Sequence, residues 1–418
     1  MTNWQTTKAS DFCLSVRDGT HDSPKRVNNG KYLITSRHII GKKIDLTKAY
    51  QISNSDYDEV NRRSKVDRWD VLFSMIGTVG EVCLVKDEPN FAIKNIGLFK
   101  SKNELFGKWL YYFLQSKKVK QVLNSLKRGT TQEYIPLGDL RNLNISYPTN
   151  ILETQKIISI LSALDDKIEN NRKMNETLET VAQVLFKSWF VDFDPVHAKA
   201  TGKTPAYMDA ETAALFPSSF GDDGLPVGWN FGTYSDAMSI YDSKRIPLSK
   251  SQRERKQGVF PYYGATSCMD YVDEYLFDGV YLLMGEDGSV IREDGTPFLQ
   301  YVWGKFWVNN HAHVLQGANG FSTEHLFCAL SSVNVAPYVT GAVQLKINQA
   351  NMKRIPIVVP TKQILSAFSE TVQPFFDKRR LNIEENQTLA ELRDTLLPKL
   401  MSGEIRVKDA EREVERAI

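Results

Sequence analysis

The stretch LETQKIISILSALDDKIENNRKMNETLETVAQVLFKSWF, from Leu152 to Phe190, decides the architecture of this chain. It contains neither Gly nor Pro, and its apolar residues recur at alternating spacings of three and four. That spacing is typical of a helix that packs on another helix through a heptad seam. The segment therefore predicts a long coiled-coil helix of about five heptads.

Two asparagines interrupt this seam at its centre. In a register with Leu161 at an a position, Asn175 also falls at a and Asn171 falls at d. The other seam positions are Ile157, Leu164, Ile168, Leu178, Ala182, Leu185 and Trp189. Buried polar seam residues lower stability but fix the register, so the asparagines predict a partner helix in one alignment. The alternative interpretation places them in solvent.

The same pattern returns in the second half of the chain, which indicates an internal repeat. Asp166, Lys167, Asn171, Asn175, Thr177 and Leu178 recur as Asp377, Lys378, Asn382, Asn386, Thr388 and Leu389. The second seam holds Val372, Phe375, Asn382, Asn386, Leu389, Leu396 and Leu400, with Arg379 and Arg393 as departures. Matched asparagines predict that the two helices pack on each other in antiparallel orientation. Pro374 is a further departure, since an interior proline bends a helix or marks its beginning.

The repeat extends into the segments that precede the helices. Trp4, Ser10 and Asp11 recur as Trp229, Ser235 and Asp236, and Gly129, Gln132, Ile135 and Pro148 recur as Gly341, Gln344, Ile347 and Pro360. Runs such as KYLIT, DVLFSMI, VYLLM and YVWGKFWV favour strands, and one helix is expected in each segment, near residues 104–126 and 323–333. The sequence therefore predicts an α+β fold with a pseudo-twofold internal repeat, in which two long antiparallel coiled-coil helices separate two mixed β-rich domains.

We expect six segments along the chain. They are a first globular domain (1–150), a central helical region (151–192), a linker (193–224), a second globular domain (225–360), a C-terminal helical region (361–405) and a charged tail (406–418).

Composition excludes several classes of protein. Hydrophobic residues make up 42% and charged residues 24%, which is ordinary for a globular protein. No apolar run is long enough to cross a membrane and the N-terminus lacks a signal-peptide pattern, so we expect a cytoplasmic protein without membrane contact. The four cysteines lie far apart without a CxxC pair, which argues against a zinc ribbon and a disulfide framework.

The net charge of +2 conceals an uneven distribution. Residues 1–150 hold 24 Lys and Arg against 15 Asp and Glu. A second basic cluster contains Lys244, Arg245, Lys250, Arg253, Arg255 and Lys256, with one acid, Glu254. Basic surface of this kind favours binding of a polyanion, and the alternative is a solvated face without a ligand.

Motifs of catalysis are scarce. The GKT at residues 202–204 lacks the upstream glycine of a phosphate-binding loop, and the paired glycines of IGTVGE and MGEDGS are typical of turns. Neither an HExxH motif nor an NPPF or NPPY tetrapeptide occurs. His311 and His313 alternate on a strand-like stretch without a third ligand nearby, so we predict a DNA-facing or structural role for them. We predict no catalytic residue and no metal site.

Several motifs together produce a family resemblance over residues 1 to about 405. DGTHDSPK, GKYLITSRHI, DVLFSMIGTVGEVCLV and RGTTQEYIPLGDLRNLNISYP are similar to the first target-recognition domain of specificity subunits of type I restriction-modification enzymes. ETQKIISILSALDDKIENNRKMNETLE with LFKSWFVDFDPV resembles that family's central helical region. FPYYGATSCMDYVDEYLFDG with FWVNNHAHVL resembles a version of its second recognition domain.

The resemblance implies a non-catalytic subunit that binds double-stranded DNA. Each recognition domain would read one half of an asymmetric bipartite site, and the helices would fix the spacer. The partners would be two methyltransferase subunits, which dock on the helices, and two restriction (motor-nuclease) subunits. S-adenosylmethionine, ATP and Mg would belong to those partners, with no cofactor in this chain. The alternative function is a protein-interaction scaffold with two adhesive domains on a coiled-coil strut.

Residues that offer phosphate or base contacts are candidates for the DNA interface. In the first domain they are Lys25, Arg26, Arg62, Arg63, Lys127, Arg128 and Gln132; in the second they are Ser243, Lys244, Arg245, Arg253, Tyr263, Asn309, Asn310 and His311. For Gly129, Gln132, Gly341 and Gln344 a turn before the last strand of each domain is the alternative. Asn171, Asn175, Asn382 and Asn386 are predicted to set the coiled-coil register.

Overall fold

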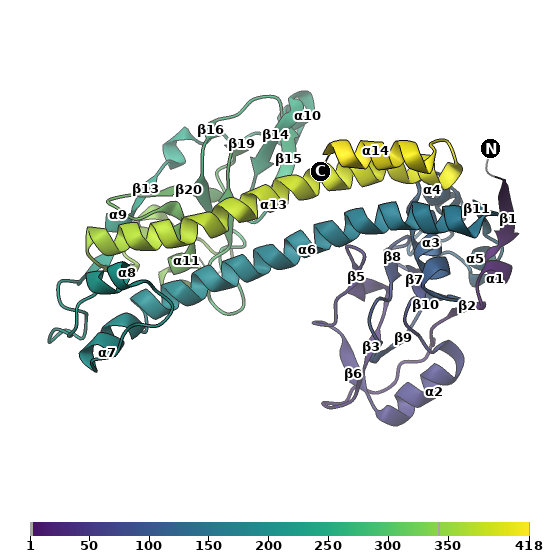
Figure 1. Ribbon diagram of the computed structural model, residues 1–418, viewed down its shortest axis with the longest axis horizontal. Helices are drawn as coiled ribbons and strands as arrows, with labels where there is room; N and C mark the ends of the chain where they lie inside the picture. The colour runs from purple at the N-terminus through teal and green to yellow at the C-terminus, as the bar shows by residue number, and fades with distance from the viewer. Residues whose placement is uncertain (1–2, 342, 418) are drawn as a thin grey trace. The chain divides into compact units, whose positions relative to one another are not determined.

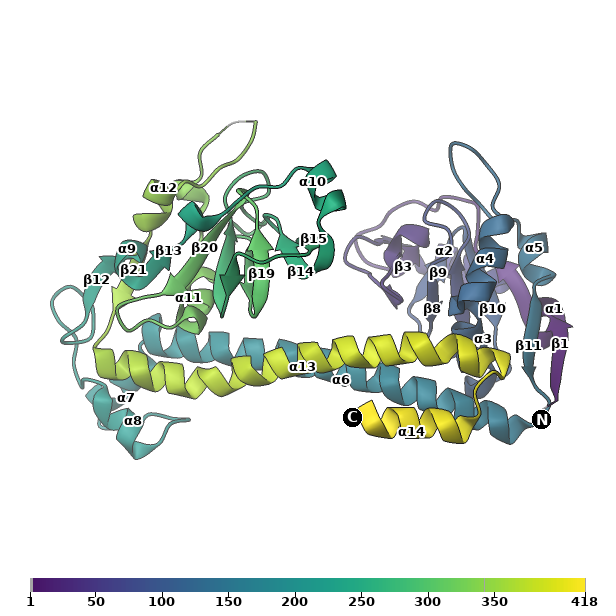
Figure 2. The ribbon, with the colours of Figure 1, turned by 90° about the horizontal axis from the view of Figure 1, so that it is seen from above.

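The computed structural model describes residues 3–341 and 343–417. The chain forms two compact units, Met1–Asn170 with Glu384–Ile418, and Asn171–Ile383. Each unit combines one globular domain with segments of two long helices (Figures 1 and 2). The first unit is assembled from both ends of the chain, whereas the second is one continuous stretch.

The first globular domain contains two main sheets and a terminal strand pair. Its elements are β1 (Trp4–Lys8), α1 (Ala9–Phe12), β2 (Ser15–Asp18), β3 (Lys31–Ile34), β4 (Ile39–Ile40), β5 (Lys43–Ile44), β6 (Tyr50–Ile52), α2 (Asn54–Ser64), β7 (Val71–Ser74), β8 (Val82–Leu84), β9 (Phe91–Ile93), β10 (Ile96–Lys100), α3 (Glu104–Gln115), α4 (Lys117–Ser125), α5 (Leu137–Arg141) and β11 (Asn144–Pro148). The central antiparallel sheet has the order β2-β10-β7-β8, and the outer sheet has the order β6-β3-β9. β1 pairs with β11, which ties the start of the domain to its end.

The second globular domain has the same kinds of sheet. Its elements are β12 (Asn230–Thr233), α9 (Tyr234–Ala237), β13 (Met238–Ile240), α10 (Lys250–Arg255), β14 (Gln257–Tyr263), β15 (Cys268–Val272), β16 (Phe277–Asp278), β17 (Tyr281–Gly285), β18 (Leu299–Val302), β19 (Lys305–Val308), β20 (Ala312–Gly317), α11 (Thr323–Leu330), α12 (Gln349–Lys353) and β21 (Pro356–Val359). The central sheet has the order β13-β20-β17-β18, the outer sheet has the order β15-β14-β19-β16, and β12 pairs with β21.

The strand pairings confirm the internal repeat. In each central sheet one middle strand is wholly buried, β7 in the first domain and β17 in the second. In each outer sheet one strand pairs parallel on one side and antiparallel on the other: β3 with β9 and β6, and β14 with β19 and β15. The outer sheets differ in their number of strands, because the second has a fourth strand, β16. The scaffold is therefore repeated, and the outer sheet is where the two domains diverge.

Two long helices carry the predicted seam. α6 (Ile151–Phe190) has 40 residues and α13 (Lys362–Ser402) has 41, so each spans about 60 Å. Neither they nor any other helix in the described ranges is long and apolar enough to cross a lipid bilayer. Buried seam residues include Ile157, Leu161, Leu164, Ile168, Ala182, Trp189, Val372, Leu389, Leu396 and Leu400. The coiled-coil prediction is therefore confirmed.

Side-chain pairs fix the orientation of the helices within each unit. Residue numbers on α13 fall as those on α6 rise, which is antiparallel pairing, as predicted. The pairs are Asp165–Arg393 and Lys167–Glu385 in the first unit, and Asn175–Asn382, Glu179–Arg379 and Phe190–Phe368 in the second.

The asparagine layer is largely buried. Asn382 is fully buried and Asn171 is 2% exposed, so the solvent-facing alternative is wrong for both. Nδ2 of Asn382 donates to Oδ1 of Asn175 over 2.8 Å. Asn175 and Asn386 are half-buried. The amide pair lies on the seam where a shift of the helices would separate it, and its role in setting the register stays a prediction.

Half-buried ion pairs explain the two arginine departures. Arg393 Nη1 donates to Asp165 over 2.7 Å, and the hydroxyl of Tyr112 on α3 donates to the same carboxylate over 2.8 Å. In the second unit Arg379 pairs with Glu179 over 3.4 Å and lies over the ring of Tyr301. Each arginine therefore joins the two helices and does not simply face solvent.

A tyrosine fixes each domain to the helices. The Tyr301 hydroxyl donates to Glu324 Oε1 over 2.6 Å and accepts from Arg380 on α13. Burial raises the pKa of Tyr112 and of Tyr301, and the neighbouring carboxylates of Asp165 and Glu324 raise each further. Both phenols therefore stay protonated as donors, which suits a permanent junction.

Pro374 neither begins nor ends the second helix. α13 starts at Lys362 and continues through Pro374 to Ser402, so the expectation that the helix begins at the proline is wrong. The side chain of Pro374 is exposed. On that face, the carbonyl group that loses its intrahelical partner can be solvated, and the proline is tolerated.

The segments predicted as linker and tail contain helices. Residues 193–224 include α7 (Asp194–Ala200) and α8 (Ala210–Leu215), and Val196 and Phe216 are buried in the core of the second unit. The last helix, α14 (Val407–Ala417), packs Ala410 into the core of the first unit.

Candidate nucleic-acid interface

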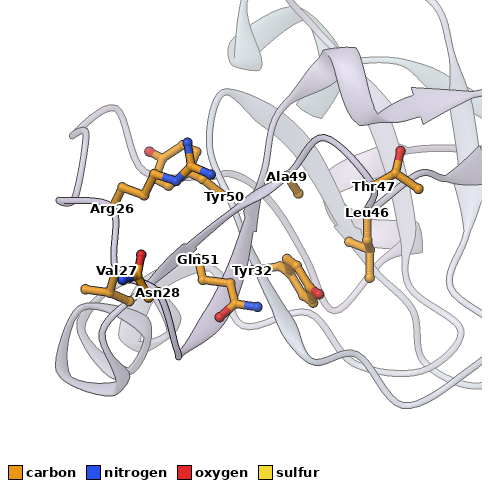
Figure 3. A pocket seen from close by; sticks show the side chains of 9 residues that line it. All are labelled: Arg26, Val27, Asn28, Tyr32, Leu46, Thr47, Ala49, Tyr50 and Gln51. Atoms are coloured by element: carbon orange, nitrogen blue, oxygen red, sulfur yellow. The ribbon is translucent and has the colours of Figure 1, made fainter. Parts of the chain in front are cut away.

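A groove in the first domain gathers side chains suited to a base edge. It has a volume of about 440 Å³ and is bordered by β3, β6 and the segments before them (Figure 3). Its lining residues are Arg26, Val27, Asn28, Tyr32, Leu46, Thr47, Ala49, Tyr50 and Gln51. Gln51 Oε1 accepts from the Gly30 amide over 2.8 Å, which leaves the NH₂ group of Gln51 as the donor. Guanidinium and amide groups are the side chains that recognise base edges.

The predicted first-domain contacts divide into exposed and paired residues. Lys25 and Arg26 are exposed, and neither has an ion pair within residues 3–341 and 343–417. Arg62 pairs with Glu59 over 3.2 Å, and Arg63 pairs with the buried Asp18. Lys25 and Arg26 are therefore the cations best placed to meet a phosphate here.

The remaining candidates of the first domain lie on or next to an exposed hairpin closed by backbone pairing of Arg128 with Tyr134. Lys127 pairs with Glu133 over 2.9 Å, and Arg128 pairs with Asp139 over 2.8 Å. Gln132 is exposed at the tip. Gly129 has a φ of 88°, so the turn predicted before the last strand is present.

The basic cluster of the second domain is mostly paired internally. Arg253 is bonded to Asp270 over 3.2 Å and to the Leu248 carbonyl over 2.8 Å. Lys256 is bonded to Glu274 over 2.7 Å. Lys244 is exposed and lies 5.1 Å from the ring centre of Tyr241, and Ser243 beside it is exposed.

Arg245 belongs to a buried charge network. Its guanidinium donates to Glu286 over 2.7 Å and to the Ala312 carbonyl over 2.6 Å. Asp242 accepts from His313 Nδ1 at 2.6 Å. Burial raises the pKa of Asp242, but His313, the Val314 amide and Arg245 together lower that pKa below its ordinary value. Arg245 therefore serves the core of the domain.

Asp242, Glu286 and His313 lie close enough together to bind a metal ion. Their carboxylates, however, already contact cationic side chains: Arg245 for both, and Lys346 Nζ at 3.3 Å for Glu286. A divalent ion would have to displace these cations, so the arrangement favours a structural network. The structural role predicted for His313 agrees with its complete burial.

The remaining candidates of the second domain surround the end of β19. Asn309 is buried, and its Oδ1 accepts from the His311 amide over 2.8 Å. Asn310 and His311 are exposed, and the His311 ring contacts Asp287. Tyr263 is half-buried, and burial raises its pKa to about 12. Only Asn310 and His311 among these face solvent.

The structure adds residues that the sequence did not suggest. Met269 and Tyr271 on β15 are 54% and 52% exposed, and Val259 on β14 is 77% exposed. Exposed apolar side chains can contact thymine methyl groups in the major groove. In the first domain the additions are Asn28, Tyr32, Tyr50 and Gln51. The alternation of CMDYV would not have located Tyr271, because the polar residue Asp270 lies on the opposite face of the strand from Met269 and Tyr271.

Known proteins resemble this chain over most of its length. The model of the type I restriction modification DNA specificity domain matches residues 1–180 and 226–392. The type I restriction enzyme HindI specificity subunit of Haemophilus influenzae is 27% identical, with 85% of this chain and 90% of that protein covered. The type I restriction enzyme MjaIX specificity subunit of Methanocaldococcus jannaschii is also 27% identical, with 81% and 78% covered.

A solved structure shares the fold. The crystal structure of a type I restriction-modification system S subunit from M. genitalium superposes with a TM-score of 0.57 at 18% sequence identity, and 96% of each chain is covered. The family match falls in both halves and includes both globular domains and most of the helices. The chain therefore belongs to the family of type I restriction-modification DNA specificity subunits, whose members recognise DNA sequence.

Proposed function

We propose that each globular domain reads one half of an asymmetric bipartite DNA site and that the two long helices set the spacer. The observation that carries this proposal is a repeated scaffold with unlike outer sheets. The first outer sheet borders a groove with Asn28 and Gln51, whereas the second exposes Met269 and Tyr271. Because different side chains prefer different base edges, two half-sites of different sequence are expected.

We propose further that catalysis resides in partner subunits. Two methyltransferase subunits would dock on the helices and supply S-adenosylmethionine chemistry, and two motor-nuclease subunits would use ATP and Mg. Apolar residues of α6 outside the seam support a docking surface, since Met174, Val181 and Val184 are at least 40% exposed. The complex would act on DNA in the cytoplasm.

The alternative is a protein-interaction scaffold that binds no nucleic acid. Charge favours the DNA proposal, because a scaffold needs no excess of 24 Lys and Arg over 15 Asp and Glu in residues 1–150. An exposed Lys25 and Arg26 without internal partners in the described part of the chain point the same way.

Footprinting distinguishes these proposals. The full chain, co-purified with the methyltransferase subunit of its own system, should protect two short sequences separated by an unspecified spacer. Replacing residues 225–360 with the second domain of another family member should change one half-site only, as mapped by methylation. Protection of a single continuous site, or a change in both halves, would contradict the two-domain proposal.

A heptad insertion tests the role of the helices. Seven residues inserted after Thr177 and seven after Thr388 preserve the seam and add about 10 Å of helix. At about 3.4 Å per base pair, the preferred spacer should lengthen by about three base pairs. That insertion also rotates one half-site by roughly 100°, which weakens binding unless DNA twists. Selection from a library of spacer lengths measures the preference, and an unchanged spacer would exclude the helices as the ruler.

A further inference from the structure

Each domain has a largely exposed segment that a pair of backbone hydrogen bonds closes, residues 128–134 in the first domain and residues 340, 341 and 343–346 in the second. In the first domain Arg128 and Tyr134 exchange both backbone hydrogen bonds, at 2.8 and 2.9 Å. In the second domain Thr340 and Lys346 do the same, at 2.7 Å each. We name these the first and second loops.

The repeated glycines of these loops have a structural explanation. Gly129 and Gly341 adopt φ values of 88° and 93°, which other residues rarely adopt. A Cβ at Gly129 would lie 2.4 Å from the Gln132 carbonyl oxygen, and one at Gly341 would lie 2.1 Å from that of Gln344. Only glycine therefore fits at these two positions.

Each loop also rests on a second glycine turn. The Gly77 amide donates to Glu133 O over 3.0 Å, and the Gly288 amide donates to Leu345 O over 2.9 Å. A Cβ added at Gly80 or at Gly288 would meet no atom within 4 Å, so the backbone of both turns is open to a close approach.

The repeated glutamines, in contrast, have no structural explanation. Gln132 and Gln344 are exposed, and neither amide side chain has a hydrogen bond to any residue that the structure describes. Other matched pairs do have internal partners: the hydroxyls of Thr177 and Thr388 bond the backbone of their own helices. The exposed amide is thus kept in both domains although their outer sheets differ.

This inference rests on the proposed function. We propose that the two loops are matched phosphate clamps, in which Gln132 and Gln344 each donate an amide N–H to a phosphate of the DNA backbone. A phosphate is present at every sequence, so one contact serves two unlike half-sites. A glutamine that reads a base in both domains would instead require the same base in both half-sites.

Replacing either glutamine with lysine adds a positive charge at the proposed phosphate contact. In the full chain with its methyltransferase subunit, Gln132→Lys and Gln344→Lys should each strengthen binding and steepen the plot of log affinity against log salt by about 0.9. Gln132→Ala and Gln344→Ala should each weaken binding about two- to tenfold. In all four variants the bases selected from a random library should stay unchanged. Gln5→Lys, an exposed position on β1 outside the loops and the long helices, is the matched control and should leave the slope unchanged.

Three outcomes would overturn the clamps. An unchanged salt slope in both lysine variants would remove the loops from the phosphates. A changed base preference would make the glutamines base readers, and loss of the methyltransferase subunit on purification would make the loops a protein-docking surface. Failure of the unaltered complex to select any sequence would instead contradict the proposed function, so the two failures are distinguishable.

Discussion

The two globular domains share a scaffold but use their basic residues differently. In the first domain Lys25 and Arg26 are exposed and lack ion pairs within the described ranges, and Arg26 lines a groove. In the second domain Arg245 and Arg253 are 11% and 14% exposed and are bonded to carboxylates. A run of basic residues in the sequence is therefore not equivalent to a basic surface, because folding brings acids from distant segments to neutralise it.

The largest expected effect sharpens this contrast at Arg245. Replacement with Met removes the 2.7 Å ion pair of Glu286 and one of the cations beside Asp242, which should cost about 3–5 kcal/mol of unfolding free energy. Thermal or denaturant unfolding of the full chain measures the loss. Arg255→Met removes an exposed cation of the same cluster and should change stability by less than about 0.5 kcal/mol. Equal effects would show that Arg245 is not a core residue.

The next effect compares the outer sheets as base readers. Asn28→Ala and Tyr271→Ala remove exposed side chains, one from each domain, and each should reduce discrimination at one base pair by about 1–3 kcal/mol. Selection of binding sites from a random library reports which half-site is relaxed. If both variants relaxed the same half-site, the assignment of one half-site to each domain would fail.

A smaller effect tests which domain supplies charge to DNA binding. Lys25→Glu with Arg26→Glu should reduce the salt slope by about one to two contacts, at about 0.9 per phosphate. Arg253→Glu with Lys256→Glu should change it less, since their partners Asp270 and Glu274 already neutralise them. Binding titrations between 50 and 200 mM salt measure both slopes. If Arg253→Glu with Lys256→Glu reduced the salt slope more than Lys25→Glu with Arg26→Glu, the second domain would be the main source of charge for DNA binding.

The smallest expected effect is on how the stability of the second domain depends on pH. Because the pKa of Asp242 is held below its ordinary 3.8, its charge stabilises the fold above that pH, and this contribution is lost as pH falls through the folded pKa. Asp242→Asn should therefore be less stable than the unaltered chain at pH 6, and the gap should narrow below about pH 4. Asp278→Asn, at an exposed carboxylate, is the control. If the difference in stability between Asp242→Asn and the unaltered chain did not change with pH, ionisation of Asp242 would not contribute to the loss of stability in acid.

The helices were more predictable than the recognition surface, for a physical reason. Burial on a coiled-coil seam imposes one residue class at a fixed period, so Leu161, Leu164 and Leu396 are readable from spacing alone. Seam positions that depart from the apolar pattern are different. Arg393, for example, pairs with Asp165, which lies far away in the sequence. Spacing along one segment contains no information about those partners.

The candidate site was predictable only in part, because surface residues obey no period. Lys25 and Arg26 were located by charge, but the groove beside them depends on Tyr32 and Gln51, which become neighbours only when β3 pairs with β6. Arg245 fits a DNA-contact pattern in sequence, and the fold instead surrounds it with Glu286 and Asp242.

The discontinuous first unit has a consequence for synthesis on the ribosome. Residues 171–383 form one continuous unit, which can fold as soon as they emerge. The first unit needs Leu396 and Leu400 to cover Ile157 and Leu161, so its apolar helix face stays open while more than 200 further residues are translated. The nascent chain thus exposes an aggregation-prone apolar surface during most of its elongation. At about 5–20 residues per second, that interval lasts on the order of 10 to 40 seconds. The half of the protein made first is the half completed last.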